Sequence, residues 1–411
     1  MNAAPDTSTQ ASEGPAPQQQ SLPRRILARL GRGAAWAVFA LIVVMGLAFF
    51  GGPIPLGPAE DAVSVIAMLV PWMTVPLIAF GAIAIAAAVL AWRAKRHALL
   101  TAGVLAGLLA ALMIAVPFAA ASTAAEDHGA ALSWGEYFAA PDTVTPDQTE
   151  TYAVIDDEKL YVDVYLPEQP AATVPAIVYV HGGGWSGGTR DESAAAQQWL
   201  ADQGLAVFSI DYRLASPPRW QDAVGDVKCA LGWVRANAGD YGVDPSNVSI
   251  AGDSAGGQLA MMAAYTVDDA QFPPSCETEE APVTSVMGWY APTDLTTLTA
   301  DSDMPASAEG YLSDYLGGTL EAETERYEAS SPLTHVTAGL PPTMIVQGEA
   351  DRLVSTAQGA ALADALESAG VPVTELDLPW THHGFTGQWG GWGSQVLRPA
   401  VAAFLEEHVA R

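Results

Sequence analysis

Three motifs that are far apart in the sequence contain the residue types needed to activate a hydroxyl nucleophile. The first is Gly252-Asp253-Ser254-Ala255-Gly256, which follows the apolar run 248–251 and precedes further small residues. Glycines on both sides of a serine allow a tight strand-to-helix turn that exposes the hydroxyl group at the start of the helix. The amide groups at that helix end favour a developing negative charge. We therefore expect Ser254 to be a nucleophile.

An acid and a base are expected later in the chain, because an architecture of this kind orders them as serine, carboxylate and histidine. Asp351 follows an apolar strand and a glycine, and it is the expected orienting acid, with Glu349 as the alternative. His383 lies in a loop after the last expected strand and is the expected general base, with His382 as the alternative. A serine hydroxyl is a weak nucleophile until an imidazole oriented by a carboxylate takes its proton.

The third motif is Val180-His181-Gly182-Gly183-Gly184-Trp185, directly after the apolar strand 176–180. Consecutive glycines allow backbone N–H groups to point into a cleft without obstruction by side chains. Together with the N–H of Ala255, these amides would form an oxyanion hole, in which each donor contributes roughly 3–4 kcal/mol of transition-state stabilisation. We expect His181 to brace the glycine loop.

These motifs lie in a region where short apolar runs alternate with Ala-rich helical patterns. Such alternation predicts an α/β fold, namely a mostly parallel central sheet with helices on both faces and functional groups at the carboxyl ends of its strands. The expected strands are 161–166, 176–180, 206–210, 248–251, 283–290, 343–347 and 373–378. The expected helices are 193–203, 220–238, 256–264 and 357–369.

The N-terminal part of the chain is chemically different and predicts a transmembrane region. The composition of residues 1–33 predicts a disordered tail with a basic end. Residues 34–121 are predicted to form about three apolar helices, 34–50, 62–92 and 98–121. An apolar helix of about 20 residues crosses a bilayer. The second stretch contains Pro71 and Pro76, so it is either one kinked helix or a short lead-in followed by a span from about Thr74. Residues 122–150 read as a linker, and 151–411 as the catalytic domain.

The charge distribution sets the expected orientation. The first 121 residues hold seven Lys/Arg and four Asp/Glu residues, while the other 290 residues hold 10 basic and 42 acidic residues. Basic clusters at 24–32 and 93–96 belong on the cytoplasmic side, which places spans one and two between them. Three spans would then leave the rear domain outside the cytoplasm, attached to the cell membrane.

The composition also argues against several classes of function. The net charge of −32 in the rear part is unsuited to phosphate backbones, so we expect no nucleic-acid partner. The two cysteines, Cys229 and Cys276, form no Cys-x-x-Cys motif and have no neighbouring histidines, so we expect no metal and no cofactor. An extracytoplasmic location would permit a disulfide between them, and the sequence leaves their pairing open.

The motifs together resemble the hormone-sensitive-lipase and BD-FAE-like branch of the α/β-hydrolases, from about Tyr152 to Ala410. The resemblance is carried by the motifs at 181–185 and 252–257 and by Asp211-Tyr212-Arg213-Leu214-Ala215. It implies a triad of Ser254, Asp351 and His383, with Gly182, Gly183 and Ala255 as oxyanion donors. One departure is Ser216-Pro217-Pro218-Arg219, where the family usually has a Pro-Glu pair, and it affects the mouth of the pocket.

The resulting expectation is a serine hydrolase that cleaves small or medium acyl esters through an acyl-enzyme. An amidase, arylformamidase or peptidase with the same triad is the alternative, and a catalytically silent binding module is a third possibility. A transporter fragment is disfavoured, because the spans carry no ionisable residue at mid-span. Segment 301–330 is the expected cap. Five aromatic residues either line an acyl pocket or only pack, namely Trp185, Trp289, Tyr290, Trp380 and Phe385.

Overall fold

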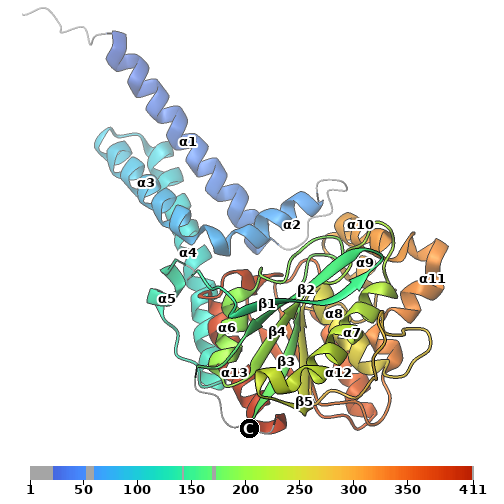
Figure 1. Cartoon of the computed structure of the whole chain (residues 1–411). Coiled ribbons are helices and arrows are strands. Elements are labelled where there is room, and N and C mark those ends of the chain that lie inside the picture. Colours follow the sequence, from blue (N-terminus) through green and yellow to red (C-terminus); the bar gives the residue numbers. More distant parts are fainter. Residues whose placement is uncertain (1–21, 52–59, 141–142, 169–172, 410–411) are drawn as a thin grey trace, which may run out of the picture. The chain divides into compact units, whose positions relative to one another are not determined.

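The computed structural model describes residues 22–51, 60–140, 143–168 and 173–409, so the expected tail of residues 1–21 lies outside the described range. The chain forms two compact units, Met1–Val44 with Pro76–Ala111, and Met45–Val75 with Leu112–Arg411. The first unit contains most of two long helices and about half of a third. The second contains the sheet and all three motifs (Figure 1).

The long helices are α1 (Leu22–Phe50), α3 (Thr74–Arg93) and α4 (His97–Asp127). Each contains a segment long and apolar enough to cross a membrane, namely Arg29–Phe50, Pro71–Arg93 and His97–Asp127. The structure extends two of the expected spans. Helix α1 begins at Leu22 rather than Ala34, because Leu, Arg and Ala all favour helix. Helix α4 continues past Ala121 into the expected linker through an Ala-rich turn.

The second apolar stretch is divided into a lead-in and a span. Helix α2 (Glu60–Leu69) is followed by the 3₁₀ turn η2 (Pro71–Met73) and then by α3. Pro71 lies at the start of η2, and Pro76 lies in the first turn of α3, where a missing N–H group breaks no helical hydrogen bond. Of the two expected alternatives, the structure therefore has the span that starts at Thr74.

The central sheet has eight strands in the order β1-β2-β4-β3-β5-β6-β7-β8. Strands β3 to β8 run parallel to one another, while β1 pairs antiparallel with β2 and β2 antiparallel with β4. The strands are β1 (Gln148–Ile155), β2 (Glu158–Tyr165), β3 (Val174–Val180), β4 (Ala206–Ile210), β5 (Val243–Asp253), β6 (Val286–Trp289), β7 (Thr343–Gly348) and β8 (Val373–Leu378).

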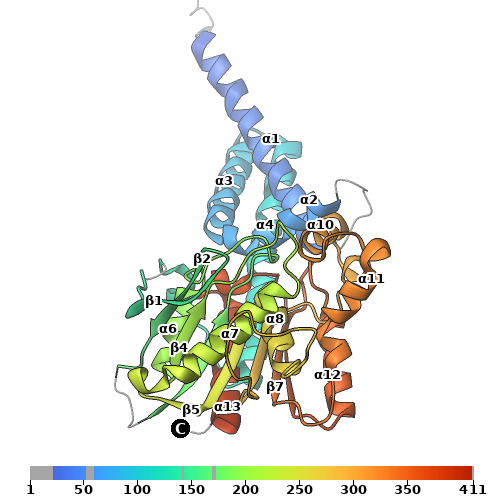
Figure 2. The same cartoon turned by 45° about the vertical axis from the view of Figure 1, so that its right-hand side comes forward.

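Helices cover both faces of the sheet, and each face has its own apolar core (Figures 1 and 2). Helices α7 (Asp222–Ala236), α8 (Ala255–Tyr265) and α12 (Thr356–Ser368) pack into one core. Helices α6 (Ala194–Asp202) and α13 (Trp392–His408) pack into the other. Strand β3 is buried along its whole length, as expected for a central strand covered on both faces.

The remaining elements are short and connect or cover the sheet. Helix α5 (Trp134–Phe138) interrupts the expected linker, and Tyr137 packs against Ala121 and Trp392. Helices α9 (Leu298–Asp301), α10 (Pro305–Leu316) and α11 (Leu320–Ala329) lie between β6 and β7, where a cap was expected. The 3₁₀ turns are η3 (Ala238–Tyr241), η4 (Pro332–His335) and η5 (Phe385–Gly387).

Candidate active site

Ser254 occupies the sharp turn between β5 and α8. Its backbone has φ +52 and ψ −123, an unusual conformation for a residue with a side chain. The flanking glycines make this turn possible, because a Cβ at Gly252 would lie 2.4 Å from the carbonyl oxygen of Gly256. A Cβ at Gly256 would lie 2.2 Å from the carbonyl oxygen of Val180. The Gly-x-Ser-x-Gly spacing is therefore a steric requirement of this turn.

The three expected triad side chains lie within hydrogen-bonding distance of one another. Ser254 Oγ is 2.8 Å from His383 Nε2, and His383 Nδ1 is 2.7 Å from Asp351 Oδ2. The Asp351 side chain is fully buried, while the His383 side chain retains 10% exposure. The other Asp351 oxygen, Oδ1, accepts hydrogen bonds from the N–H groups of Leu353 and Val354 at 2.8 and 2.9 Å. Both oxygens of the Asp351 carboxylate therefore accept hydrogen bonds, which fixes its orientation.

The two alternatives considered for the acid and the base lie elsewhere. Glu349 is exposed to solvent, and the His383 Nδ1 atom is bonded to Asp351 instead. His382 is only 4% exposed, and its ring lies 5.8 Å from that of Phe49. Among these candidates, Asp351 and His383 are the pair hydrogen-bonded in line with Ser254.

The glycine loop runs beside Ser254. Gly183 and Gly184 have φ values of +117 and +58, which glycine adopts without steric strain. A Cβ at Gly182 would lie 3.2 Å from the Cβ of Ser254, so this backbone approaches the serine closely. His181 braces the loop as expected: its Nδ1 lies 2.7 Å from the carbonyl oxygen of Gly182.

Asp253 is an acidic residue beside the nucleophile to which the sequence interpretation gave no role. Its carboxylate accepts hydrogen bonds from the hydroxyl groups of Tyr179 and Tyr290, both at 3.0 Å. Burial raises the pKa of the Asp253 carboxyl above its usual range, and the two phenol donors partly oppose this rise. The Tyr290 ring also lies 4.9 Å from the His383 ring. Asp253 therefore links the nucleophile turn to the neighbouring strands.

A cavity of about 280 Å³ opens over Ser254. It is lined by Gly183, Gly184, Ser254, Ala255 and His383, and by apolar residues from the cap and the acid loop, including Leu298, Ala308, Tyr311, Leu353 and Val354. The sequence interpretation located the cap but identified no cap residue that lines the cavity. Periodicity alone gave no signal for Tyr311, because this ring is partly exposed on α10.

The five expected aromatic residues have different positions. Trp185 and Tyr290 line the cavity over Ser254. Trp289 is fully buried in the core on the α6 and α13 face. Trp380 and Phe385 line a different cavity, on the other side of the histidine loop. Only two of the five are therefore suited to contact an acyl group.

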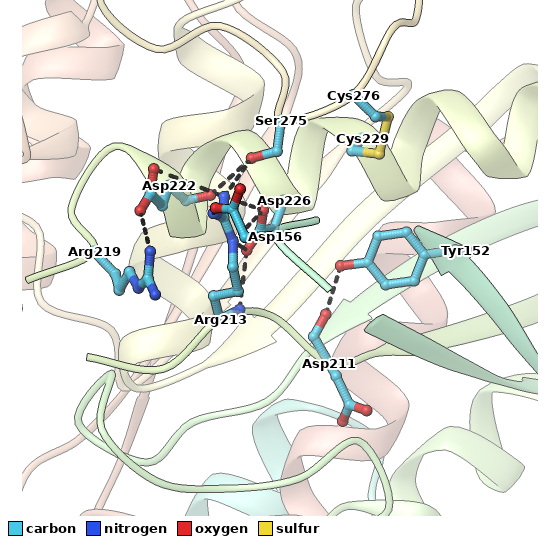
Figure 3. Close-up of polar contacts among 10 residues, drawn as sticks. All are labelled: Tyr152, Asp156, Asp211, Arg213, Arg219, Asp222, Asp226, Cys229, Ser275 and Cys276. Atoms are coloured by element: carbon cyan, nitrogen blue, oxygen red, sulfur yellow. Dashed lines mark hydrogen bonds and ion pairs between the residues drawn. A yellow bond between two sulfur atoms is a disulfide. The ribbon is translucent and has the colours of Figure 1, made fainter. Parts of the chain in front are cut away.

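The Asp211-Tyr212-Arg213 motif has a structural role near the glycine loop (Figure 3). The Arg213 guanidinium donates to both carboxylate oxygens of Asp226, at 2.8 to 3.2 Å, and to Ser275 Oγ at 2.9 Å. The Asp226 side chain is fully buried and that of Arg213 is 6% exposed. Tyr212 donates to the carbonyl oxygen of His181 at 3.2 Å and stacks on its ring. The motif therefore fixes the end of β4 against α7 and the glycine loop.

Cys229 and Cys276 form a disulfide, which resolves the pairing that the sequence left open (Figure 3). The bond joins α7 to the loop before β6 across a sequence separation of 47 residues. It lies close to Ser275, which is a partner of Arg213. The disulfide and the buried ion pair therefore fasten the same loop to α7.

Comparison with known proteins identifies relatives of this region. The BD-FAE family profile matches residues 162–366. The chain is 33% identical over 215 residues to the probable carboxylic ester hydrolase LipM of Mycobacterium tuberculosis, covering 52% of this chain and 50% of that protein. It is 32% identical over 234 residues to the carboxylesterase NlhH of the same species, covering 54% of this chain and 70% of that protein. The chain spans about half to five-eighths of the length of LipM and the esterase LipC.

Among solved structures, an esterase resembles the same region of the chain. The propionate-bound esterase Est2 of Thermogutta terrifontis superposes with a TM-score of 0.54 at 29% identity, covering 64% of this chain and 96% of that chain. The same esterase phosphoramylated by tabun superposes with a TM-score of 0.54 at 25% identity, covering 67% of this chain and all of that one.

Proposed function

The chain belongs to the carboxylesterase branch of the α/β-hydrolases, and from this premise we propose that it is a membrane-anchored serine hydrolase of carboxylic esters. Ser254 is the nucleophile, His383 the general base and Asp351 the orienting acid. The observation that carries the proposal is the hydrogen-bonded line from Ser254 Oγ through His383 to Asp351, at 2.8 and 2.7 Å. A catalytically silent binding module would not require these three side chains to be aligned.

In the first half of the reaction His383 Nε2 takes the proton of Ser254 as Oγ attacks the ester carbonyl carbon. Asp351 accepts the hydrogen bond from His383 Nδ1–H, which fixes the tautomer and stabilises the imidazolium. His383 then gives its proton to the departing alcohol, and the acyl group stays on Ser254. In the second half water attacks the acyl-enzyme with the same base, and the acid product leaves.

The negative charge that develops on the carbonyl oxygen is stabilised by the amides of Gly182, Gly183 and Ala255. The support is the close approach of the glycine loop to Ser254 and the position of Ala255 at the first turn of α8. A helix N-terminus favours negative charge. Each donor is expected to contribute about 3–4 kcal/mol to the transition state.

The cavity favours esters with short or medium acyl chains. Its volume of about 280 Å³ lies just below the range of roughly 300–1,000 Å³ for ligand pockets, and its cap-side wall is apolar. The related Est2 structures contain propionate and butyrate. Ester and amide cleavage share this triad, so matched p-nitrophenyl esters and anilides with one acyl group separate carboxylesterase from amidase activity.

The membrane part of the proposal rests on three apolar helices and on the charges beside them. Each helix is long enough to span a bilayer. The basic residues Arg29 and Arg32, at the start of the first span, and Arg93 and Arg96, at and just after the end of the second, favour a cytoplasmic location for both clusters. The catalytic domain is then extracytoplasmic, a compartment in which a disulfide such as Cys229–Cys276 persists.

The decisive experiment is covalent labelling of the full chain with a fluorophosphonate probe. We expect Ser254 to carry the label, and Ser254→Ala to abolish labelling and lower p-nitrophenyl butyrate hydrolysis by at least about 10⁴-fold. Ser246→Ala is the matched control, because this exposed serine lies on the same strand. Unchanged labelling of Ser254→Ala would exclude Ser254 as the nucleophile.

Topology needs a separate test. External protease added to intact cells should release the catalytic domain, while a cytoplasmic marker protein in the same cells stays intact. If the domain is fully protected until the cells are permeabilised, the orientation is the opposite of the one proposed.

A further inference from the structure

Helix α2 (Glu60–Leu69) lies between the first two candidate membrane spans in the sequence. The first span ends at Phe50, and the second begins at Pro71, two residues after the end of α2. Two residues extend a chain by at most about 8 Å, so the C-terminal end of α2 stays close to the start of the second span. In a chain anchored by these spans, α2 therefore lies at the surface of the bilayer.

The two faces of α2 differ in exposure. Ser64 and Ala67 are buried on one face. Val65 and Leu69, four residues apart on the other face, are 41 and 50% exposed, and Trp72 in the following turn is 49% exposed. These three side chains form an apolar stripe at helical spacing. A helix with one buried face and one exposed apolar face at the end of a membrane span is suited to lie in the bilayer interface.

Helix α2 is also hydrogen-bonded to the cap. Asp61 Oδ2 accepts hydrogen bonds from the N–H and hydroxyl groups of Ser307, at 2.8 and 2.6 Å. Ser64 Oγ donates to the carbonyl oxygen of Asp303 at 3.0 Å. Both partners lie at or just before the first turn of α10, and the two helices lie side by side in both views (Figures 1 and 2). The cap is therefore fastened to a helix at the membrane surface.

Two walls of the candidate active-site cavity are held in this way by segments near the ends of the spans. On the cap, Ala308 lines the cavity and directly follows the serine that Asp61 binds. On the acid loop, Leu353 lines the cavity and directly follows Arg352, which donates to the carbonyl oxygen of Ala48 at 3.2 Å. Ala48 belongs to the last turn of the first candidate span. Both walls therefore lie close to the level at which the spans leave the bilayer.

The size of this cavity limits which part of an amphiphilic ester enters it. A volume of about 280 Å³ admits a short acyl group with its carbonyl, but not a long hydrocarbon chain as well. The long chain then belongs to the alcohol part, which stays outside the cavity. Such an ester partitions into a bilayer, because each methylene group removed from water favours the transfer. Its ester group remains at the surface, where the cavity walls are held.

We propose that the apolar stripe of α2 lies in the bilayer surface and keeps the active-site cavity there, so that the enzyme cleaves short-chain acyl esters of amphiphilic alcohols held in the adjacent leaflet. The inference rests on the proposed function and names its substrate class. Helix α2 carries no lysine or arginine, so apolar burial rather than lipid charge holds it in place. Soluble esters of the same acyl group reach the cavity from water and serve as the reference.

The contact with the bilayer is tested on the full chain in phosphatidylcholine nanodiscs. Leu69→Cys is labelled with a fluorophore, and phosphatidylcholine with a nitroxide near its head group serves as the quencher. The reference is Ser246→Cys, because Ser246 is exposed at the start of β5 and Ser254 follows the other end of that strand. We expect quenching at position 69 to be at least about three-fold stronger. Equal quenching at the two positions overturns the bilayer contact.

The substrate class is tested by comparing two butyrate esters. Hexadecyl butyrate is held in the nanodisc bilayer, whereas p-nitrophenyl butyrate arrives from water. Val65→Glu combined with Leu69→Glu should lower hydrolysis of hexadecyl butyrate at least about ten-fold and leave that of p-nitrophenyl butyrate within about two-fold. The matched control, Ala236→Glu combined with Ser246→Glu, adds the same charge at exposed positions where α7 ends and β5 begins. It should leave both rates within about two-fold.

Fluorophosphonate labelling of Ser254 shows whether each variant is folded, and Val65→Gln with Leu69→Gln replaces the glutamate pair if two charges disturb α2. An equal loss of both activities in the stripe variant, or no loss of either, overturns the inference. A wild-type chain that hydrolyses only p-nitrophenyl butyrate overturns this substrate class alone, whereas a wild-type chain inactive on both esters overturns the proposed function.

Discussion

Replacing His382 by glutamine should make the protein less sensitive to acid. Burial lowers the pKa of His382 to about 4, from 6.5 for an exposed imidazole. The unfolded chain therefore binds a proton at this residue near pH 6.5, whereas the folded chain remains neutral until about pH 4. The contribution of the neutral imidazole to the free energy of unfolding is complete above pH 6.5, and it is lost progressively as the pH falls toward 4.

The magnitude follows from the size of this window. Each pH unit between the two pKa values is worth about 1.4 kcal/mol, so lowering the pH from 6.5 to 4.5 removes roughly 2.7 kcal/mol from the free energy of unfolding. For a domain of this size 1 kcal/mol shifts the melting temperature by about 2–4 °C, which gives an acid-induced shift of roughly 5–10 °C attributable to His382. Glutamine does not titrate, so any fixed penalty from burying it is the same at both pH values.

The assay is the apparent melting temperature of the detergent-solubilised full chain at pH 6.5 and 4.5. We expect His382→Gln to lose roughly 5–10 °C less than the wild type between these values, and the exposed His128→Gln to behave as the wild type. Fluorophosphonate labelling of Ser254 should persist in His382→Gln, because His383 holds the hydrogen bond to the serine. Equal acid sensitivity in His382→Gln and the wild type would refute the buried, neutral imidazole.

Three further predictions concern the pocket, the disulfide and the buried ion pair. Tyr311→Ala should enlarge the cavity that Tyr311 lines. We expect kcat/KM for the octanoyl p-nitrophenyl ester, relative to the hexanoyl ester, to rise about tenfold, since two buried methylenes contribute ~1.6 kcal/mol. An unchanged ratio would show that Tyr311 does not contact the acyl group. Replacing Cys229 and Cys276 together by serine should lower the free energy of unfolding by about 2–4 kcal/mol, measured by thermal unfolding, without lowering kcat. Arg213→Met should cost about 3–5 kcal/mol by leaving Asp226 buried and unpaired, and adding Asp226→Leu should recover much of that loss in a double-mutant cycle.

Most of the sheet could be predicted from the sequence because its central strands β3, β4, β6 and β7 are short apolar runs that are buried along their whole length. The expected strands 206–210 and 373–378 coincide with β4 and β8, and each of the five others overlaps an observed strand. Strand β1 was missed, since it lies at the sheet edge, most of its residues are exposed, and it carries few apolar side chains. Helix α13 was also missed, because Gly393 and Pro399 interrupt its pattern, although the packing of Val396, Leu397 and Phe404 against the sheet holds it in place.

The proposed catalytic residues were easier to predict than the residues that line the cavity. Ser254, Asp351 and His383 follow strand ends, and a parallel sheet brings its carboxyl ends to one edge. Whether the cap residues Ala308 and Tyr311 line the cavity depends on how α10 packs, and this packing is not encoded by a recognisable spacing in the sequence. The sequence favoured His383 as the base with His382 as the alternative, and the hydrogen bonds of His383 to Ser254 and Asp351 distinguish the two in the structure.

The contacts of the membrane-proximal segments argue against a catalytic unit that starts at residue 151. Arg352, beside the triad acid, donates to the carbonyl oxygen of Ala48 at 3.2 Å, where a cation stabilises the C-terminal end of α1. Asp61 on α2 accepts hydrogen bonds from the N–H and hydroxyl groups of Ser307 at 2.8 and 2.6 Å. Ser307 precedes Ala308, which lines the cavity over the nucleophile. Both the acid loop and the cap are therefore held by residues that precede the second apolar span, so these segments stabilise the site as well as anchoring it.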